Sequence, residues 1–326
     1  MSKDYDGLEG LLESRDMSRR AFVGRCAQAA AGAALSGLLM AARPALAASS
    51  GRKKTRAKGN HDLVVVKGDD PAAIVRKAVE AMGGMGKFVK KGAVVVIKPN
   101  MAWDRTPEQA GNTNPAIMAE LVAMCIAVGA RRVNVFDRPC NTAKRCYDNS
   151  GIREAAESKG AKVYYVDEWN AVKAKFGYES PMADWPVFRD AVECDTFINV
   201  PIVKHHDLTG VTLSMKNLMG ICLGNRGNIH DGIGRKLADV TDFIKPDLTI
   251  IDAYRVLTAH GPSGGDLADV ALRKTVIVGT DPVLSDAYAA ELFGLKPLDV
   301  PYIAEGVARK LGSADLKAAK IRSIGA

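Results

Sequence analysis

The sequence predicts an α/β fold, a mostly parallel sheet with helices on both faces. Continuous apolar, β-branched runs such as residues 93–97 and 196–200 are typical of strands that are buried on both sides. Helical patterns, with apolar residues three and four positions apart, alternate with these runs, as in residues 71–82. The chain has 326 residues and 47% hydrophobic content, which is enough for a sizeable core.

The first 47 residues read as a twin-arginine export signal. Arg19 and Arg20 precede a mildly apolar run of Ala, Gly and Leu from about residue 27 to residue 40, and Ala45-Leu46-Ala47 supplies a small-x-small cleavage site. That run is too short and too rich in glycine to span a bilayer comfortably, and no later stretch approaches about 20 apolar residues. We therefore expect the twin-arginine export machinery as a partner, a periplasmic or otherwise exported location, and no stable membrane span in the mature form.

A basic linker follows at residues 48–60. Of the formal net charge of +8, five positive charges fall between residues 52 and 58, and Gly and Ser flank them, so we expect a flexible segment. The rest of the chain is only mildly basic, and aromatic residues are 6% of the total. Proteins that bind nucleic acid usually combine a basic face with interleaved aromatic residues, so we expect no nucleic-acid partner.

Residues 61–326 are expected to form a single α/β domain. Besides 196–200, the expected strands are 63–66, 93–97, 132–136, 162–166, 248–251 and 275–278. The expected helices are 71–82, 114–128, 152–159, 237–244 and 281–293, several of which end at glycine. Residues 167–195 lack a clear periodicity and are interpreted as an insertion or a small lobe.

Polar residues follow four of the strands at their carboxyl ends. In open α/β sheets, ligands bind in the crevice beyond those ends, so these side chains are expected to share one edge. The candidates for catalysis or anion binding are Lys98, Lys204, His206, Lys216 and Asn217. On an extended backbone, Lys204 and His206 point to the same side and His205 to the other.

A divalent metal is one hypothesis for this edge. Its candidate ligands are His206, His230, Asp137 and Asp252, since imidazole and carboxylate groups bind such ions. His206 is equally consistent with a structural hydrogen bond, and His230 is equally consistent with an exposed side chain.

Cysteine spacing leaves several interpretations open. Cys140 and Cys146 could form a disulfide in an oxidising compartment, remain free thiols, or supply thiolates to an iron–sulfur cluster together with Cys194 and Cys222. The spacing matches no standard ferredoxin run.

Residues 94–312 resemble the family called domain of unknown function 362. The resemblance rests on IKPN at 97–100, the Lys204-x-His206 pair, TLSMKNLMG at 212–220, His230, and the segments IIDA, HGPSGGD and TDPVLSDAYA. It implies an iron–sulfur protein, because members are often described as such, and the cysteine segment 140–146 resembles the exported branch. This chain lacks the appended CxxCxxC module of some members.

Three functions compete at this stage. The first is an exported cofactor-bearing protein whose metal or iron–sulfur centre serves electron transfer with a redox partner or a redox reaction. The second is a metal-dependent hydrolase or lyase acting on an acidic small molecule. The third is a non-catalytic module that binds a small anionic ligand through the same basic residues.

Overall fold

The computed structural model describes residues 48–52, 57–177 and 179–325, so the predicted export signal lies outside the described residues. Its main sheet has ten strands. In spatial order eight of them are β13 (Ile321–Ile324), β2 (Leu63–Lys67), β12 (Val270–Gly279), β11 (Leu248–Leu257), β8 (Thr196–Val200), β3 (Val94–Pro99), β4 (Arg132–Val135) and β5 (Lys162–Val163). The other two, β9 (Ile202–His206) and β10 (Gly210–Thr212), pair with each other, and β9 also pairs with β11.

Most strand pairs are parallel. The run β11, β8, β3, β4 and β5 is parallel throughout, whereas β12 is antiparallel to both β11 and β2. From β3 the chain proceeds to β4 and β5 on one side, and β8 then pairs with β3 on its other side. The direction of winding therefore reverses at β3, which is where open α/β sheets place ligand crevices.

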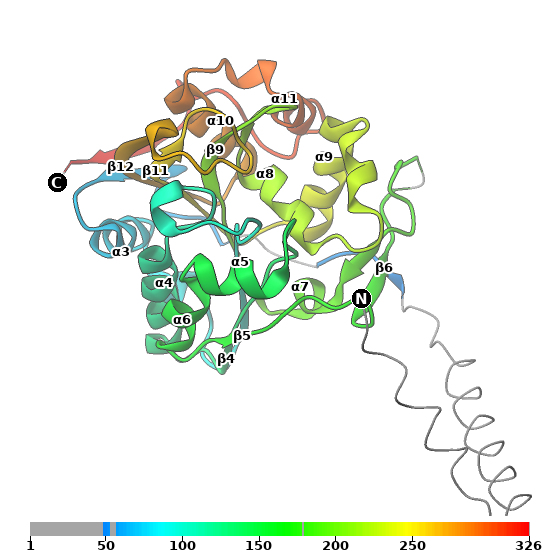
Figure 1. Ribbon diagram of the computed structural model, residues 1–326, viewed down its shortest axis with the longest axis horizontal. Helices are drawn as coiled ribbons and strands as arrows, with labels where there is room; N and C mark the ends of the chain where they lie inside the picture. The colour runs from blue at the N-terminus through cyan, green and yellow to red at the C-terminus, as the bar shows by residue number, and fades with distance from the viewer. Residues whose placement is uncertain (1–47, 53–56, 178, 326) are drawn as a thin grey trace, which may run out of the picture. The chain divides into compact units, whose positions relative to one another are not determined.

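Helices cover both faces of this sheet (Figure 1). On one face lie α3 (Pro71–Ala81), α4 (Pro115–Ala127) and α6 (Ile152–Glu157). On the other lie α8 (Ser214–Asn217), α9 (Ile233–Ile244), α10 (Pro282–Phe293) and α11 (Pro301–Ala308). The α/β class with a mostly parallel sheet is thus confirmed, and its cause is the burial of apolar strands on both sides.

Alternate strand residues build the core beneath α3 and α4. Val95 and Ile97 of β3 belong to one buried apolar cluster with Ile74 of α3 and Ile117 of α4. The N-termini of these helices are set by their sequence, because the Asp70 side chain accepts a hydrogen bond from the Ala72 amide and a proline follows each cap.

Residues 167–195 hold a second, smaller sheet. It contains β6 (Ala171–Ala174) and β7 (Pro186–Phe188), and α7 (Arg189–Glu193) follows. Its third strand is β1 (Ala48–Ser49), which comes from the segment predicted to be a flexible linker. That prediction is wrong at Arg52, which is buried and forms an ion pair with Asp247 at 3.1 Å, because a buried carboxylate holds it in place.

Two strands are longer than expected. β11 continues past Asp252 to Leu257, and β12 begins at Val270, since the two pair over their whole length around a bulge. Asp252 therefore lies within a strand instead of at its end. Its carboxylate accepts hydrogen bonds from the amides of Asn114 (2.7 Å) and Tyr254 (2.9 Å), which ties the start of α4 to the sheet.

Candidate functional site

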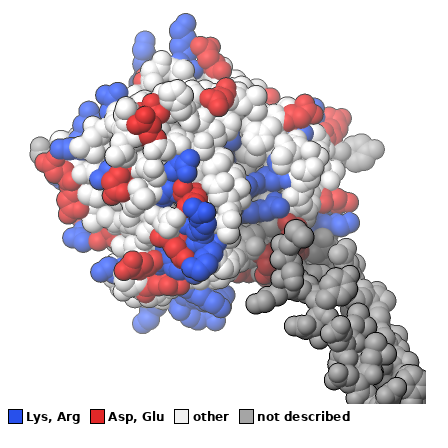
Figure 2. Space-filling view, in the orientation of Figure 1, with Lys and Arg blue, Asp and Glu red and all other residues white. Residues whose placement is uncertain are grey.

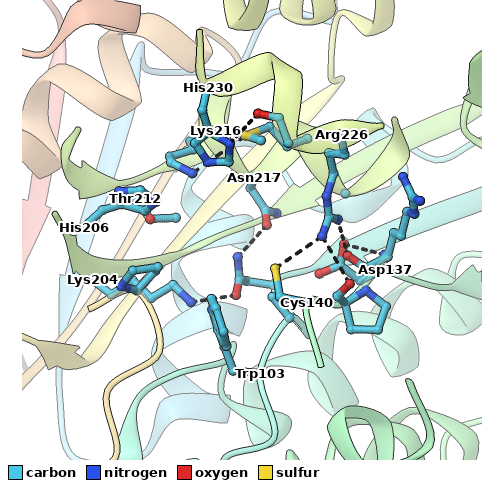
Figure 3. Close-up of a pocket in the computed structure, with 18 of the residues that line it drawn as sticks. Trp103, Asp137, Cys140, Lys204, His206, Thr212, Lys216, Asn217, Arg226 and His230 are labelled. Atoms are coloured by element: carbon cyan, nitrogen blue, oxygen red, sulfur yellow. Dashed lines mark hydrogen bonds between the residues drawn. The ribbon is translucent and has the colours of Figure 1, made fainter. Parts of the chain in front are cut away.

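A cavity of about 610 Å³ opens beyond the carboxyl ends of β3 and β4 and beside β9 (Figure 3). Most of its lining comes from the loop after β3, the loop after β4, β9, α8 with the turn that follows it, and the glycine-rich segment that carries η4 (Arg226–His230). Its polar lining residues are Asn100, Trp103, Asp137, Arg138, Cys140, Lys204, His206, Thr212, Lys216, Asn217, Asn225, Arg226 and His230.

A buried ion pair forms the floor of this region. The Lys98 ammonium lies 2.8 Å from the Asp137 carboxylate, and both side chains are almost fully buried. The carboxylate also accepts hydrogen bonds from the amides of Met101 (2.7 Å) and Arg138 (2.9 Å). Burial lowers the pKa of Lys98, while the Asp137 carboxylate acts in the opposite direction. Lys98 thus neutralises a carboxylate and does not itself line the cavity.

Two asparagines connect this pair to the next lysine. Asn217 accepts hydrogen bonds through Oδ1 from Lys98 (3.2 Å) and from Asn100 Nδ2 (3.1 Å). Asn100 in turn accepts one from Lys204 Nζ at 3.0 Å. Because these four side chains are nearly buried, the hydrogen-bond network fixes the positions of the Lys98 and Lys204 ammonium groups.

Three cationic side chains face the cavity without a carboxylate. Lys204 donates to Asn100 and to the Gly111 carbonyl (2.6 Å), and among the described residues the Lys216 ammonium has one hydrogen-bond partner, the Met219 sulfur at 3.7 Å. No Asp or Glu in the described part of the chain forms an ion pair with Lys204, Lys216 or Arg226. Burial lowers the pKa of Lys204 to about 7 and that of Lys216 to about 8.

Two histidines on the cavity wall carry their protons on opposite nitrogens. The Leu208 amide donates to His206 Nδ1 (3.2 Å), so a neutral His206 carries its proton on Nε2. His230 Nδ1 lies 3.1 Å from the Gly227 carbonyl, which only accepts, so its Nε2 keeps a lone pair. Burial lowers the pKa of His206 to about 3 and also lowers the pKa of His230. The stacked rings, with centroids 6.1 Å apart, thus offer a ligand one donor and one acceptor.

Strand alternation places the side chains of β9 as expected. Lys204 and His206 line the cavity, whereas His205 points away from it and accepts a hydrogen bond from the Gly261 amide at 3.1 Å. The prediction that Lys204 and His206 share one side is therefore confirmed.

The short helix α8 presents Lys216 and Asn217 because two groups hold it. The buried Asp286 carboxylate of α10 accepts hydrogen bonds from the amides of Ser214 (2.7 Å) and Met215 (2.9 Å). At the other end, Gly220 lets the chain pass over the buried ion pair, since a Cβ there would lie 1.8 Å from Asp137 Oδ1. The Asp286 carboxylate is therefore buried against α8 and does not line the cavity.

The four candidate thiolates do not come together. Cys140 is exposed on the cavity wall, while Cys146, Cys194 and Cys222 are buried at separate positions. Within the described residues, none of these four cysteines forms a disulfide, so Cys140 and Cys146 are not bonded to each other. Burial raises the pKa of Cys146 to about 11 and that of Cys222 to about 12, which disfavours the thiolates that iron requires. These residues do not fit a four-cysteine iron–sulfur cluster.

The predicted divalent-metal ligands are also separated. Asp137 is occupied by Lys98 and two amides, and Asp252 lies within β11 and does not line the cavity. Only His206 and His230 remain near each other. Across residues 48–52, 57–177 and 179–325, no three His, Cys, Asp or Glu side chains are grouped as metal ligands.

Sequence reasoning missed Trp103 and Arg138. Trp103 follows β3, and its ring centroid lies 5.9 Å from the Lys204 ammonium. Arg138 forms an ion pair with Glu168 (3.0 Å) and donates to the Cys222 and Gly224 carbonyls, so it connects the loop after β4 to the glycine-rich segment. The available signal was their position shortly after strand ends, since Arg138 directly follows Asp137 and Trp103 is three residues after Asn100.

Comparison with known proteins finds one matching family model and several distant relatives. The model of the domain of unknown function DUF362 matches residues 95–291. The Thylakoid-associated protein sll1697 of Synechocystis sp. is 25% identical over 244 residues, which are 71% of this chain and 73% of that protein.

Two solved structures are more remote. The lactate racemase apoprotein of Thermoanaerobacterium thermosaccharolyticum has 13% identity and a TM-score of 0.45, covering 74% of this chain and 58% of that one. A Thermotoga maritima protein has 15% identity and a TM-score of 0.35, covering 70% of this chain and 60% of that one. This chain therefore spans roughly three fifths of each of these two structures.

Proposed function

The chain belongs to the DUF362 family, and from that premise we propose that its cavity binds a small molecule carrying a carboxylate or phosphate group. The observation that carries this proposal is the set of three cations, Lys204, Lys216 and Arg226, that face one cavity without a carboxylate partner among the described residues. A buried cation without a counter-ion is costly, and an anionic ligand would supply the missing charge.

The neighbouring groups match such a ligand. A volume of about 610 Å³ suits a small molecule and excludes a folded partner. Asn100, which is itself hydrogen-bonded to Asn217, holds Lys204 in place before a ligand arrives, which reduces the entropy lost on binding. The donor of His206 and the acceptor of His230 can bind a hydroxyl or similar group on the same ligand.

The charges outside the cavity favour a local site over a broad anionic partner. Figure 2 shows acidic and basic side chains interspersed over one face of the molecule. An extended polyanion would instead require a continuous basic surface.

Neither predicted metal centre is supported by these side chains. A cluster would need thiolates from positions that the fold keeps apart, and a divalent ion would find two imidazoles where three or four ligands are usual. The proposed function therefore includes no step through a metal.

Titration calorimetry with sulfate and with malonate tests the proposal. Replacing Lys216 by Met keeps the volume and removes the charge, and it breaks only the contact with Met219. We expect Lys216→Met to weaken the binding of both anions about tenfold or more, and a tenfold loss of affinity corresponds to about 1.4 kcal/mol. The matched control replaces the exposed Lys159 by Met and should leave both affinities unchanged. Equal affinities in the two variants, or no binding to the unmodified protein, would refute the proposal.

We also propose that the protein is exported through the twin-arginine route. The support is the Arg19-Arg20 pair and the cleavage site after Ala47. In the described part of the chain, no helix has the length and apolar character needed to cross a bilayer. Replacing both arginines by Lys should leave the precursor unprocessed in cell fractions, and normal processing of that variant would contradict the route.

A further inference from the structure

Cys140 differs from the other cysteines that the structure describes. It is exposed, whereas Cys125, Cys146, Cys194 and Cys222 are buried. Together with Trp103 it lines both the anion cavity and an adjoining cavity of about 600 Å³. Cys140 is therefore accessible from both cavities.

The surroundings of Cys140 are those of a nucleophile. Its amide donates to the Ala102 carbonyl at 2.8 Å, which fixes the backbone that carries the side chain. Arg226 Nη2 lies 3.2 Å from Sγ and donates to it, as Figure 3 shows. A guanidinium donor stabilises the negative charge that sulfur carries when it attacks an electrophile.

A second feature indicates that a ligand lies beside this sulfur. Lys216 is more than nine-tenths buried and lines the same cavity, and within the described part of the chain its ammonium has only a methionine sulfur as a hydrogen-bond partner. Lys204, on the same wall, donates only to neutral acceptors. These ammonium groups can hold the anionic end of a molecule whose other end reaches Cys140.

We propose that Cys140 is a nucleophile toward an electrophilic carbon of a small molecule that bears a carboxylate or phosphate group. Addition to the carbonyl carbon of an aldehyde or ketone is the simplest such step. The proposal rests on the anion site described above. In this addition the S–C bond forms, the π pair of the C=O bond moves to oxygen, and the thiol proton ends on that oxygen. The product is a hemithioacetal or hemithioketal, so the step is balanced and needs no oxidant, reductant or leaving group.

Alkylation of the intact chain by two reagents tests the nucleophile. Iodoacetate and iodoacetamide react by the same displacement, in which the S–C bond forms and iodide leaves with the C–I electron pair, but only iodoacetate is anionic. The ratio of the iodoacetate rate to the iodoacetamide rate is measured for Cys140 by peptide mass spectrometry and compared with that of glutathione. We expect a ratio about tenfold higher at Cys140, equivalent to about 1.4 kcal/mol, because the cavity cations attract the carboxylate. Sulfate should protect Cys140 from both reagents.

Two variants make the result decisive. Lys216→Met should lower the rate ratio toward that of glutathione, and Lys159→Met should not change it. A ratio equal to that of glutathione, or labelling unaffected by Lys216→Met, overturns the proposal. Sulfate binding measured on the same samples separates the two conclusions: retained binding with an unreactive Cys140 removes the nucleophile and leaves the anion site, whereas absent binding removes both.

Discussion

Replacing Asp137 by Asn removes one partner of the buried ion pair that underlies the cavity. The Lys98 ammonium would keep only neutral acceptors, namely the Pro99 carbonyl at 2.8 Å, Asn217 Oδ1 at 3.2 Å and the oxygen of the new amide. The new amide nitrogen would also face at least one donor, because the carboxylate now accepts from Lys98 and from the amides of Met101 and Arg138.

Burial determines the size of the effect. The exposed fractions of the two side chains are 0% and 2%, so water cannot replace the lost partner. Leaving one charge of a buried pair uncompensated costs about 3–5 kcal/mol of unfolding free energy. The matched control is Asp148→Asn, which breaks an ion pair with Lys144 and a longer one with Arg153 at 3.7 Å; the side chains of Asp148 and Lys144 are 34% and 76% exposed. Ion pairs between such exposed side chains add little to stability, so this change should be nearly neutral.

Urea unfolding of both variants measures the difference. A second change, Lys98→Met combined with Asp137→Asn, should cost less than the sum of the single changes, because no buried charge then lacks a partner. A loss below about 1 kcal/mol for Asp137→Asn, or additive single effects, would refute the assignment of this pair as a buried, charged unit.

Three further outcomes follow from the same geometry. Gly220→Ala should lower the thermal unfolding temperature, because the new Cβ would disrupt the buried ion pair. Gly86→Ala is the control and should leave that temperature unchanged, since its Cβ would meet its nearest neighbour at 3.7 Å. Sulfate affinity should fall as the pH rises through 7 and then 8, because Lys204 and Lys216 lose their protons in that range. Calorimetry below and above this range measures the change, and a constant affinity would show that the lysines do not bind sulfate. Burial lowers the pKa of His206 from the ordinary 6.5 of histidine to about 3, so the unfolded state takes up the proton first. Stability should therefore fall as the pH drops from 6.5 toward 3. His206→Asn, whose side-chain oxygen can still accept from the backbone, should flatten that decline in urea titrations, and an unchanged slope would contradict the buried neutral ring.

Local pattern was enough to identify most parallel strands and several helices. The apolar runs before Lys98 and Asp137 could only be buried strands, and the polar residues after them lie at the same edge because parallel strands end together. The alternation at Lys204 and His206 follows from the strand period of two. Each of these inferences depends only on residues that are close together in the sequence.

Pairings between distant segments were not predictable in this way. The antiparallel strand β12, the small sheet that includes β1, and the ion pair of Arg52 with Asp247 depend on contacts between residues far apart in sequence. The extension of β11 beyond Asp252 has the same origin, because its partner strand supplies the hydrogen bonds.

Residue patterns identify the fold class, the family and the edge of the sheet where polar groups gather. Which of those groups are available to a ligand depends on the folded chain: it pairs Lys98 with Asp137, leaves Lys204 and Lys216 without a carboxylate among the described residues, and separates the cysteines. The physical reason is that residue type sets the charge and hydrogen-bonding capacity of a side chain. Its partners and its burial, which decide what that capacity can do, are set by packing between distant parts of the chain.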